Sequence, residues 1–417
     1  TDSGFSVKII DADYDYLKTK DIANKALLHN PSIIGVYAST TQIYEALEFA
    51  KLIKKHDKNI KLILGGPHIT SDPAFFRYCS KYFDYAILGE AEITLPKTIK
   101  RILSKKQKRK VIMSIPPDCL DTLPFPSYHD YNMNNSRIPI FKGKSIYLFV
   151  SRGCPYDCIF CSIKHKIRYR SPENIMDEIK YLKEKYGFNT FFFQCCNFTL
   201  GKKHALAVCD SIIKSKMKLR WGTSTRCNLI DEELIKKMKS AGCININFGI
   251  ESGSYRIRKI IGKDFSDKKI KESYRLCRKY GITTSYYWLF GHPTETLEDM
   301  KKTIRLSLKV GDYASFSPVF LYSNTELFGM ALDERKITRD KFYQCVLNNK
   351  MGFVYIPDNM TKSQIILIYF WAHIRFYLRP KQVFNLIKVI NFYNLRSYFR
   401  YIRRFRFAIK PEKAPLN

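Results

Sequence analysis

The sequence predicts an α/β protein with two successive series of parallel β-α units and a helical region at the end of the chain. Three observations predict it. Short β-rich runs alternate with helical stretches over residues 6–104, a longer alternation occupies residues 145–321, and the segment between them is basic and then rich in proline. Strands separated by helices are typical of parallel sheets. A chain of 417 residues is long enough for two or three domains.

The first series is expected to fold as a Rossmann-like domain over residues 1–125. Its β-rich runs are residues 7–10, 33–36, 61–64 and 85–88, and its helical stretches are residues 43–56 and 93–104. In an open parallel sheet the carboxyl ends of the strands form the ligand crevice. We therefore expect a ligand near the small and polar residues that follow these runs, which include Ser39, Thr40, Gly65, Gly66, Gly89 and Glu90. The chain begins at Thr1, close to a strand, so we also expect an N-terminal truncation.

The second series is expected over residues 145–325, after a linker at 126–144 that shows no sustained periodicity. Six β-α units of this kind would curl into a partial (β/α)6 barrel, whose catalytic loops collect at the carboxyl ends of the strands. Residues 326–417 are expected to be helical. The expected strands are 145–150, 190–194, 219–224, 244–250, 283–290 and 314–321, and the expected helices are 172–186, 202–215, 231–240, 267–280 and 296–310.

The chain is strongly basic, with a net charge of +33, and its field attracts anions. A lysine-rich proteome would explain this charge as well as an anionic partner would. After residue 360, basic residues alternate with aromatic ones and form a candidate contact face: Arg375, Arg379, Lys381, Lys388, Arg396, Arg400, Arg403, Arg404, Arg406 and Lys410. No apolar run approaches the roughly 20 residues that span a bilayer. We expect a cytoplasmic protein, with peripheral membrane contact through this face as the alternative to a solvated helical cap.

Three of the twelve cysteines fall within Cys154-Pro-Tyr-Asp-Cys158-Ile-Phe-Cys161, directly after an expected strand. This clustering favours metal binding in a reducing compartment over a disulfide framework. Three thiolates at this spacing can converge on one 4Fe-4S cluster and leave one iron open to chelate a substrate. A structural zinc site would usually need paired C-x-x-C motifs and a fourth ligand.

The cysteine loop, preceded by Ser151-Arg-Gly153, resembles that of the radical S-adenosylmethionine (SAM) superfamily, and the resemblance continues through residue 300. Four segments resemble the cobalamin-binding branch, which includes the anaerobic magnesium-protoporphyrin monomethyl ester oxidative cyclase and hopanoid and phosphonate C-methyltransferases. They are Ile9-Ile-Asp11-Ala-Asp13, Leu64-Gly-Gly-Pro-His68, Leu88-Gly-Glu90-Ala-Glu92 and Leu123-Pro-Phe-Pro126. The resemblance implies a 4Fe-4S cluster, SAM, cobalamin and an external one-electron reductant of the flavodoxin or ferredoxin type.

The same resemblance implies roles for individual residues. Phe160 would lie against the adenine of SAM, unless it only packs in the core. Gly249 and Glu251 would form the ribose-binding strand end, unless Glu251 faces solvent. Ser224 and Arg226 would bind the methionine carboxylate. Cobalamin would lie over Ser39, Thr40, Gly65, Gly66, Gly89 and Glu90.

Two features depart from related patterns. Family members usually carry paired aspartates after the second barrel strand, whereas this chain reads Gln194-Cys195-Cys196-Asn197. Recognition of the methionine amino group would then fall to backbone carbonyls, and the two cysteines are redox partners, radical quenchers or buried hydrophobes. The first domain also lacks an Asp-x-His-x-x-Gly motif, so His68 is expected to be a loop residue with its polar groups satisfied rather than a cobalt ligand.

The function predicted from these features is reductive cleavage of SAM to a 5′-deoxyadenosyl radical, followed by cobalamin-dependent C-methylation of an unactivated carbon. The alternative is radical oxidative cyclisation without methyl transfer. Methylthiotransferase chemistry is disfavoured because only Cys79 and Cys119 precede the cysteine loop. A non-catalytic nucleic-acid-binding cluster protein is a remote alternative. The charge favours a small or lipid-like anionic substrate.

Overall fold

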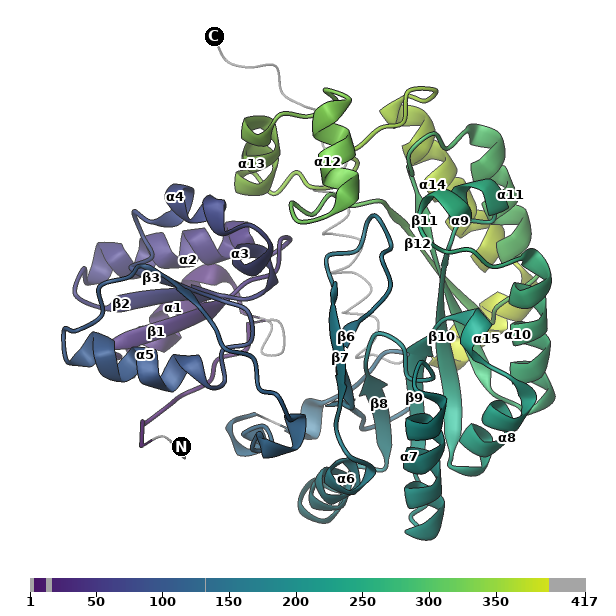
Figure 1. Ribbon diagram of the computed structural model, residues 1–417, viewed down its shortest axis with the longest axis horizontal. Helices are drawn as coiled ribbons and strands as arrows, with labels where there is room; N and C mark the ends of the chain where they lie inside the picture. Colours follow the sequence, from purple (N-terminus) through teal and green to yellow (C-terminus); the bar gives the residue numbers. More distant parts are fainter. Residues whose placement is uncertain (1–3, 13–16, 132, 390–417) are drawn as a thin grey trace. The chain divides into compact units, whose positions relative to one another are not determined.

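A computed structural model describes residues 4–12, 17–131 and 133–389 and divides the chain into two compact units (Figure 1). The first unit comprises residues up to 118, 122–131 and 322–354, and the second comprises 119–121, 132–321 and the chain from 355 onward. Residues 326–354, which the sequence places in the C-terminal helical region, therefore pack with the first unit, as do residues 322–325 from the end of the expected barrel.

The first unit contains a four-stranded parallel sheet in the order β1-β2-β3-β4. The β-α alternation predicted for this region is therefore confirmed. Its strands are β1 (Ile33–Tyr37), β2 (Lys61–Gly65), β3 (Tyr85–Leu88) and β4 (Val111–Met113). Its helices are α1 (Thr19–Leu27), α2 (Ile43–His56), α3 (Pro67–Ser71), α4 (Phe76–Cys79), α5 (Thr94–Leu103), α12 (Glu326–Asp333) and α13 (Arg339–Leu347).

The strand predicted at residues 7–10 is wrong, because residues 4–12 form no strand. A run of β-formers becomes a strand only when it finds a hydrogen-bonding neighbour, and periodicity cannot identify that neighbour. The fourth strand, β4, instead lies in the basic segment 105–145, where no strand was predicted. Helix α1 was also missed.

The second unit contains a six-stranded, all-parallel sheet in the order β12-β11-β10-β9-β8-β5. This order confirms the six β-α units of the predicted partial barrel, and helices cover one face of the sheet (Figure 1). The strands are β5 (Ile146–Phe149), β8 (Thr190–Gln194), β9 (Arg220–Thr225), β10 (Cys243–Glu251), β11 (Thr283–Phe290) and β12 (Tyr313–Pro318). The helices are α6 (Pro172–Tyr186), α7 (Lys202–Lys214), α8 (Glu232–Ser240), α9 (Tyr255–Ile260), α10 (Asp267–Lys279), α11 (Leu297–Ser307), α14 (Lys362–Tyr377) and α15 (Pro380–Val389).

Helix α6 shows why the predicted bounds of the barrel elements agree so closely with the structure. The hydroxyl of Ser171 accepts a hydrogen bond from the Asn174 amide, and Pro172 occupies the first helical position. Gly187 ends the helix in the left-handed conformation, with φ of 71°. A polar cap, an early proline and a terminal glycine are all visible in sequence.

The two faces of the barrel sheet differ in chemistry. Phe193 and Trp221 face the helices, where their rings stack at 4.7 Å. On the inner face, the strand register aligns Phe192 with Gly222 and Asn247 with Ser224. Because side chains alternate along a strand, the inner face combines amides, hydroxyls and glycines with aromatic rings such as that of Phe192.

The expected loop 151–170 contains a hairpin that was not predicted. Strands β6 (Ser151–Cys154) and β7 (His165–Tyr169) pair antiparallel, with Ser151 opposite Tyr169. The cysteine loop lies between these two strands.

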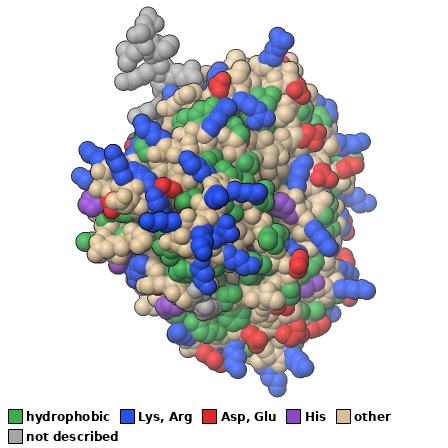
Figure 2. All heavy atoms as spheres, turned by 60° about the vertical axis from the view of Figure 1, so that its left-hand side comes forward, with side chains coloured by type: hydrophobic (Ala, Val, Ile, Leu, Met, Phe, Trp, Pro, Cys, Tyr) green, Lys and Arg blue, Asp and Glu red, His purple; other side chains and the backbone are tan. Residues whose placement is uncertain are grey.

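Within the described part of the chain, no helix is long and apolar enough to cross a membrane. Lysine and arginine side chains predominate over acidic ones on the face shown in Figure 2, in keeping with the composition. Of the basic residues in the predicted C-terminal contact face, Arg375, Arg379 and Lys381 have described side chains, whereas the others lie outside the described side chains.

Candidate active site

The cysteine loop begins on a glycine that no other residue could easily replace. Gly153 has φ of 93°, and a Cβ there would lie 2.5 Å from the carbonyl oxygen of Lys166 on the facing strand. Cys154 ends β6, Cys158 is buried, and Cys161 is partly buried. The close approach of β6 and β7 thus determines where the loop starts.

The three thiols lie in one electrostatic environment. Burial raises the pKa of Cys161, and the charges of Cys158 and Cys154 raise it further. A hydrogen bond from the thiol of Cys196 is the largest cause that lowers the pKa of Cys154, to about 6. Asn197 Nδ2 also donates to Cys154 Sγ at 3.5 Å. The sequence-predicted cysteines are therefore brought together.

No three His, Cys, Asp or Glu side chains of the described residues have the geometry to hold a single metal ion. A cubane cluster binds each thiolate through a different iron, so its ligands lie farther apart than those of one ion. Three thiols carried by one loop fit the ligand set of a 4Fe-4S cluster.

Arg226 is fixed against the cysteine loop, directly after β9. Its Nη1 donates to Cys158 Sγ at 3.6 Å, its Nη2 donates to the Gly262 carbonyl at 3.3 Å, and its guanidinium lies 3.9 Å from the centroid of the Tyr156 ring. The side chain is 6% exposed, and its Nε has no hydrogen-bond partner. This cation therefore faces the sulfur of Cys158 and retains one unused donor.

Glu251 is buried at the end of β10, so the alternative of a solvent-facing glutamate is wrong. Lys263 Nζ donates to Glu251 Oε1 and to the Gly249 carbonyl, both at 2.8 Å. A Cβ on Gly249 would lie 2.6 Å from that Oε1 and 2.8 Å from that Nζ. Lys263 was missed in the sequence, because no local pattern marks a lysine that will pair with a strand-end glutamate.

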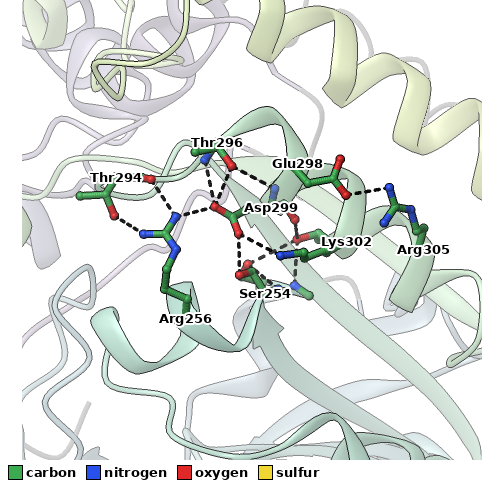
Figure 3. A network of polar contacts seen from close by, with 11 residues as sticks. Ser254, Arg256, Thr294, Thr296, Glu298, Asp299, Lys302 and Arg305 are labelled. Atoms are coloured by element: carbon green, nitrogen blue, oxygen red, sulfur yellow. Dashed lines mark hydrogen bonds and ion pairs between the residues drawn. The ribbon is translucent and has the colours of Figure 1, made fainter.

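A polar network holds the segment after β10 to the start of α11 (Figure 3). Ser254 Oγ donates to Asp299 Oδ1 at 2.7 Å, and Arg256 pairs with Asp299 Oδ2. Thr296 and Asp299 form a capping box at the helix start. Burial would raise the pKa of Asp299, but hydrogen bonds from Ser254, Arg256 and Thr296 lower it to about 2. The Glu251 loop is thus attached to a rigid helix end.

Phe160 is partly buried, and its ring lies 6.0 Å from the ring of His292. His292 is fully buried, neither ring nitrogen has a partner, and burial lowers its pKa to about 3. Glu295 Oε2 accepts from the amides of Gly291 at 2.7 Å and His292 at 3.0 Å. Burial raises the pKa of Glu295 to about 8, so both side chains are mostly neutral at pH 7.

The two adjacent cysteines after β8 differ in their surroundings. Cys195 is buried, and burial raises the pKa of its thiol to about 12, which fits a small hydrophobic residue. Cys196 is partly buried, and its thiol donates to Cys154.

The strand ends of the first unit are built mainly from backbone. Gly66 has φ of 101°, and a Cβ there would lie 2.7 Å from the Ala38 carbonyl oxygen. Gly89, with φ of 87°, donates its amide to Thr70 Oγ1 at 2.9 Å. Ser39 Oγ donates to Gln42 Oε1 at 2.7 Å. Gly65 ends β2, whereas Glu90 is partly buried just after β3.

His68 lies beside these glycines and is 2% exposed. Its Nδ1 is 3.2 Å from Thr40 Oγ1, whereas its Nε2 has no partner. Burial lowers the pKa of His68 to about 4. The expectation that its polar groups are satisfied therefore holds for one ring nitrogen only. Close backbone approach and an unused polar atom fit a large ligand that covers this sheet edge.

Two family models match the chain: "Radical SAM superfamily" over residues 148–307 and "B12 binding domain" over residues 1–99. An uncharacterized methyltransferase of Pyrococcus horikoshii is 31% identical over 398 residues, which are 90% of this chain and 85% of that protein. The anaerobic magnesium-protoporphyrin IX monomethyl ester cyclase of Cereibacter sphaeroides is 25% identical over 390 residues, which are 82% of this chain and 63% of that protein.

Among solved structures, the radical SAM methyltransferase TsrM from Kitasatospora setae, with cobalamin and a [4Fe-4S] cluster bound, matches with a TM-score of 0.63. The match covers 87% of this chain and 75% of that one at 18% identity, so it supports the fold.

Proposed function

The chain belongs to the radical SAM superfamily and carries a B12-binding domain ahead of the radical SAM domain, and from this premise we propose that it transfers a methyl group to an unactivated carbon. It is an enzyme whose cofactors are a 4Fe-4S cluster, SAM and cobalamin. When bound, these groups supply a 5′-deoxyadenosyl radical and a methyl group. The convergence of three thiols from one loop on a site that also contains Arg226 is the observation that carries the proposal.

The residues of the second unit would bind the cluster and SAM and orient them. Cys154, Cys158 and Cys161 would bind the cluster. Arg226 places its positive charge beside Cys158 and offers its free Nε to the methionine carboxylate of SAM. The other proposed contacts to SAM are Phe160 for the adenine, Gly249 and Glu251 for the ribose, and Ser224 for the methionine end. In this arrangement Lys263 holds Glu251 in place for a sugar hydroxyl.

In the first unit, Ser39, Thr40, Gly65, Gly66, Gly89 and Glu90 are the proposed contacts to cobalamin. Gly66 lets the chain pass close to the backbone of Ala38, and Gly89 is exposed after β3, so backbone would face a large planar ligand at this edge. His68 stays neutral because it is buried. We propose no cobalt bond from it.

Oxidative cyclisation is the second candidate, because the cyclase of Cereibacter sphaeroides aligns with 82% of this chain. Both reactions share radical formation and differ in the fate of the substrate radical after hydrogen removal. We propose that the substrate is a small molecule and that the external one-electron reductant is a flavodoxin or ferredoxin.

Anaerobic reconstitution tests cluster binding and the cleavage of SAM. The full chain should take up one 4Fe-4S cluster and, with reductant, convert SAM to 5′-deoxyadenosine. Each of C154A, C158A and C161A should lose both properties, whereas C119A, at an exposed cysteine, should keep them. Cleavage that survives in any of the three loop variants would contradict the assignment of the cluster ligands.

Retention of cobalamin by the chain tests the proposed methyl transfer. After saturation and desalting, absorbance should show cobalamin bound to the chain, and methyl-labelled SAM should pass its label to the protein-bound cofactor. A chain that cleaves SAM but retains no cobalamin would favour the cyclisation alternative or chemistry without methyl transfer.

We also propose that this enzyme contacts an anionic membrane surface through helix α14. One face of α14 is buried, yet the opposite side exposes a second apolar stripe: Leu367 (68%), Phe370 (44%), Trp371 (44%), Ile374 (52%) and Leu378 (72%). The guanidinium of Arg375 lies 5.5 Å from the Trp371 ring centroid, and the sequence has no Asp or Glu from 359 to 411. Apolar side chains next to cations suit an anionic lipid surface.

Vesicle co-sedimentation tests this contact. The intact chain should bind vesicles with phosphatidylserine more strongly than purely phosphatidylcholine vesicles, and L367D/L378D should lose most of this binding while it keeps its cluster. Equal binding to both vesicle types would exclude the proposed surface.

A further inference from the structure

The inner face of the barrel sheet borders an open cavity of about 330 Å³, and most of its lining residues take no part in the contacts around the cysteine loop. Its side walls are aromatic and come from Tyr147, Phe192 and Tyr287, while residues 138–140 also line it. The remaining wall is polar and comes from Gln194, Ser224 and Asn247. A volume of this size falls within the range of small-molecule sites.

The strand register explains why these side chains meet. Tyr147 pairs in register with Phe192, and Ser224 pairs with Asn247, so all four point to the same side of a continuous parallel sheet. Tyr147 and Tyr287 are 50% and 41% exposed although they lie on the inner face. The cavity is therefore open to solvent and to a ligand.

Residues 138–141 pack closely against the sheet and form one wall of the cavity. Phe141 packs on Phe192 with ring centroids 6.3 Å apart, in one cluster with Ile138. A Cβ on Gly222 would lie 2.9 Å from the Phe141 ring, so the glycine makes room for this wall. At the opposite side, Ser224 stands two residues before Arg226, which contacts Cys158. The cavity is thus apolar on this side, and one of its polar lining residues, Ser224, neighbours a residue that contacts the cysteine loop.

Asn247 gives the cavity an unused acceptor. It is 5% exposed, and its Nδ2 donates to the Tyr287 hydroxyl at 3.1 Å, while its Oδ1 has no partner. A buried carbonyl oxygen without a donor is costly, and the phenol that accepts from the amide still has its own proton to donate. The two groups form an acceptor and donor pair on the cavity wall.

None of the lining residues carries a charge. Burial raises the pKa of both Tyr147 and Tyr287, so their phenols stay neutral. A carboxylate or phosphate in this cavity would give up part of its hydration and find no lining cation in return. The wall chemistry thus opposes the anionic substrate that the net charge alone would favour.

We propose that this cavity binds a planar, uncharged part of the substrate that carries both an N–H donor and an acceptor, such as a carboxamide or a neutral nitrogen heterocycle. The aromatic walls provide stacking surfaces, and Asn247 with Tyr287 pairs with the amide edge. The inference rests on the proposed function for the identity of the ligand as a substrate, and any anionic portion of the same molecule would lie outside the cavity.

Ligand-observed NMR on the full chain, without reductant, tests the proposal with two matched probes, benzamide and benzoate. Benzamide should bind at least about tenfold more tightly. N247L should weaken benzamide binding about tenfold, and Y287F should weaken it several-fold with the ring retained. N228L, at an exposed asparagine of the same unit, is the control.

Benzoate binding as tight as benzamide would overturn the proposal, as would unchanged benzamide binding in both cavity variants. Y287F removes one hydroxyl and keeps the proposal testable if N247L does not fold. Because SAM cleavage and methyl transfer are measured in separate assays, a failed binding test leaves the proposed reaction standing. Failed catalysis with intact benzamide binding would instead contradict the reaction.

Discussion

The carboxyl ends of the two parallel sheets occupy equivalent places in their units but are built from different chemistry. In the first unit the edge consists of glycine backbone and a neutral buried histidine, with Gly66 packed against Ala38 and His68 against Thr40. In the second unit the edge contains buried ions, namely Arg226 beside Cys158 and Glu251 paired with Lys263.

This difference indicates two ways to hold a cofactor. Glycines permit a large ligand to approach the backbone along a broad surface, and they add little electrostatic selectivity. Buried ions are expensive and persist only when each has a partner, so they position a small, charged ligand with narrow tolerance. Substitutions at each edge can test whether the first depends on shape and the second on charge.

Removal of one charge of the buried Glu251–Lys263 pair should have the largest effect on stability. K263M leaves the Glu251 carboxylate buried without its partner and should destabilise the second unit by about 3–5 kcal/mol. Urea unfolding followed by tryptophan fluorescence measures it, because Trp221, Trp288 and Trp371 all lie in the second unit. K263M/E251L should recover much of the loss. A double variant as unstable as the single one would show that packing, not charge, matters there.

A shape change at the first edge should have a somewhat smaller effect. G66A places a Cβ 2.7 Å from the Ala38 carbonyl oxygen at φ of 101° and should destabilise the first unit by about 1–3 kcal/mol. It should also reduce cobalamin retention, while cluster content and tryptophan fluorescence remain unchanged. G35A, where nothing lies within 4 Å of the added Cβ, is the control. Equal cobalamin binding in both variants would contradict a shape-dependent edge.

The smallest effect on stability is expected from a change of pH. Glu295 has a pKa of about 8 in the folded chain and an ordinary value of 4.5, so the folded state holds the proton more tightly. Its stabilising contribution is complete below about pH 4.5 and is lost as pH rises to 8. His292, with a pKa of about 3 against an ordinary 6.5, acts in the opposite sense and contributes fully above 6.5.

The contributions of Glu295 and His292 to the free energy of unfolding therefore change in opposite directions up to about pH 6.5. Between pH 6.5 and 8 a net decrease of about 1 kcal/mol in the free energy of unfolding remains. Urea midpoints of the second unit at these two pH values measure it. E295Q should flatten the decline, since glutamine does not titrate. An equal decline in E295Q would assign it to another group.

Local signals were enough to predict most of the fold. Helix α6 was predicted to the residue because Ser171, Pro172 and Gly187 mark its ends within the chain segment itself. The failures concern partners distant in sequence. Residues 7–10 look like a strand but form none, and β4 formed in a basic segment because β3 offers it a hydrogen-bonding edge.

The candidate site shows the same limit. The spacing of the three cysteines was sufficient to predict that they converge, because they lie on one loop. The contact of Arg226 with Cys158 and the pairing of Lys263 with Glu251 join residues far apart or on different elements, and no sequence period reports them. The neutral cavity also escaped prediction, because the net charge of +33 describes the surface and not the barrel interior.

The hairpin around the cysteine loop also has a consequence for the order of events during synthesis. Pairing of Ser151 with Tyr169 closes only a short loop, which costs little chain entropy and is fast. Arg226 leaves the ribosome 65 residues after Cys161, roughly 3–13 s later at ordinary translation rates. For those seconds Cys158 lacks the Arg226 guanidinium that lies against its sulfur in the folded chain. Machinery that delivers iron and sulfide to the nascent chain meets an open loop, whereas later delivery must reach Cys158 past the guanidinium of Arg226 and the ring of Tyr156.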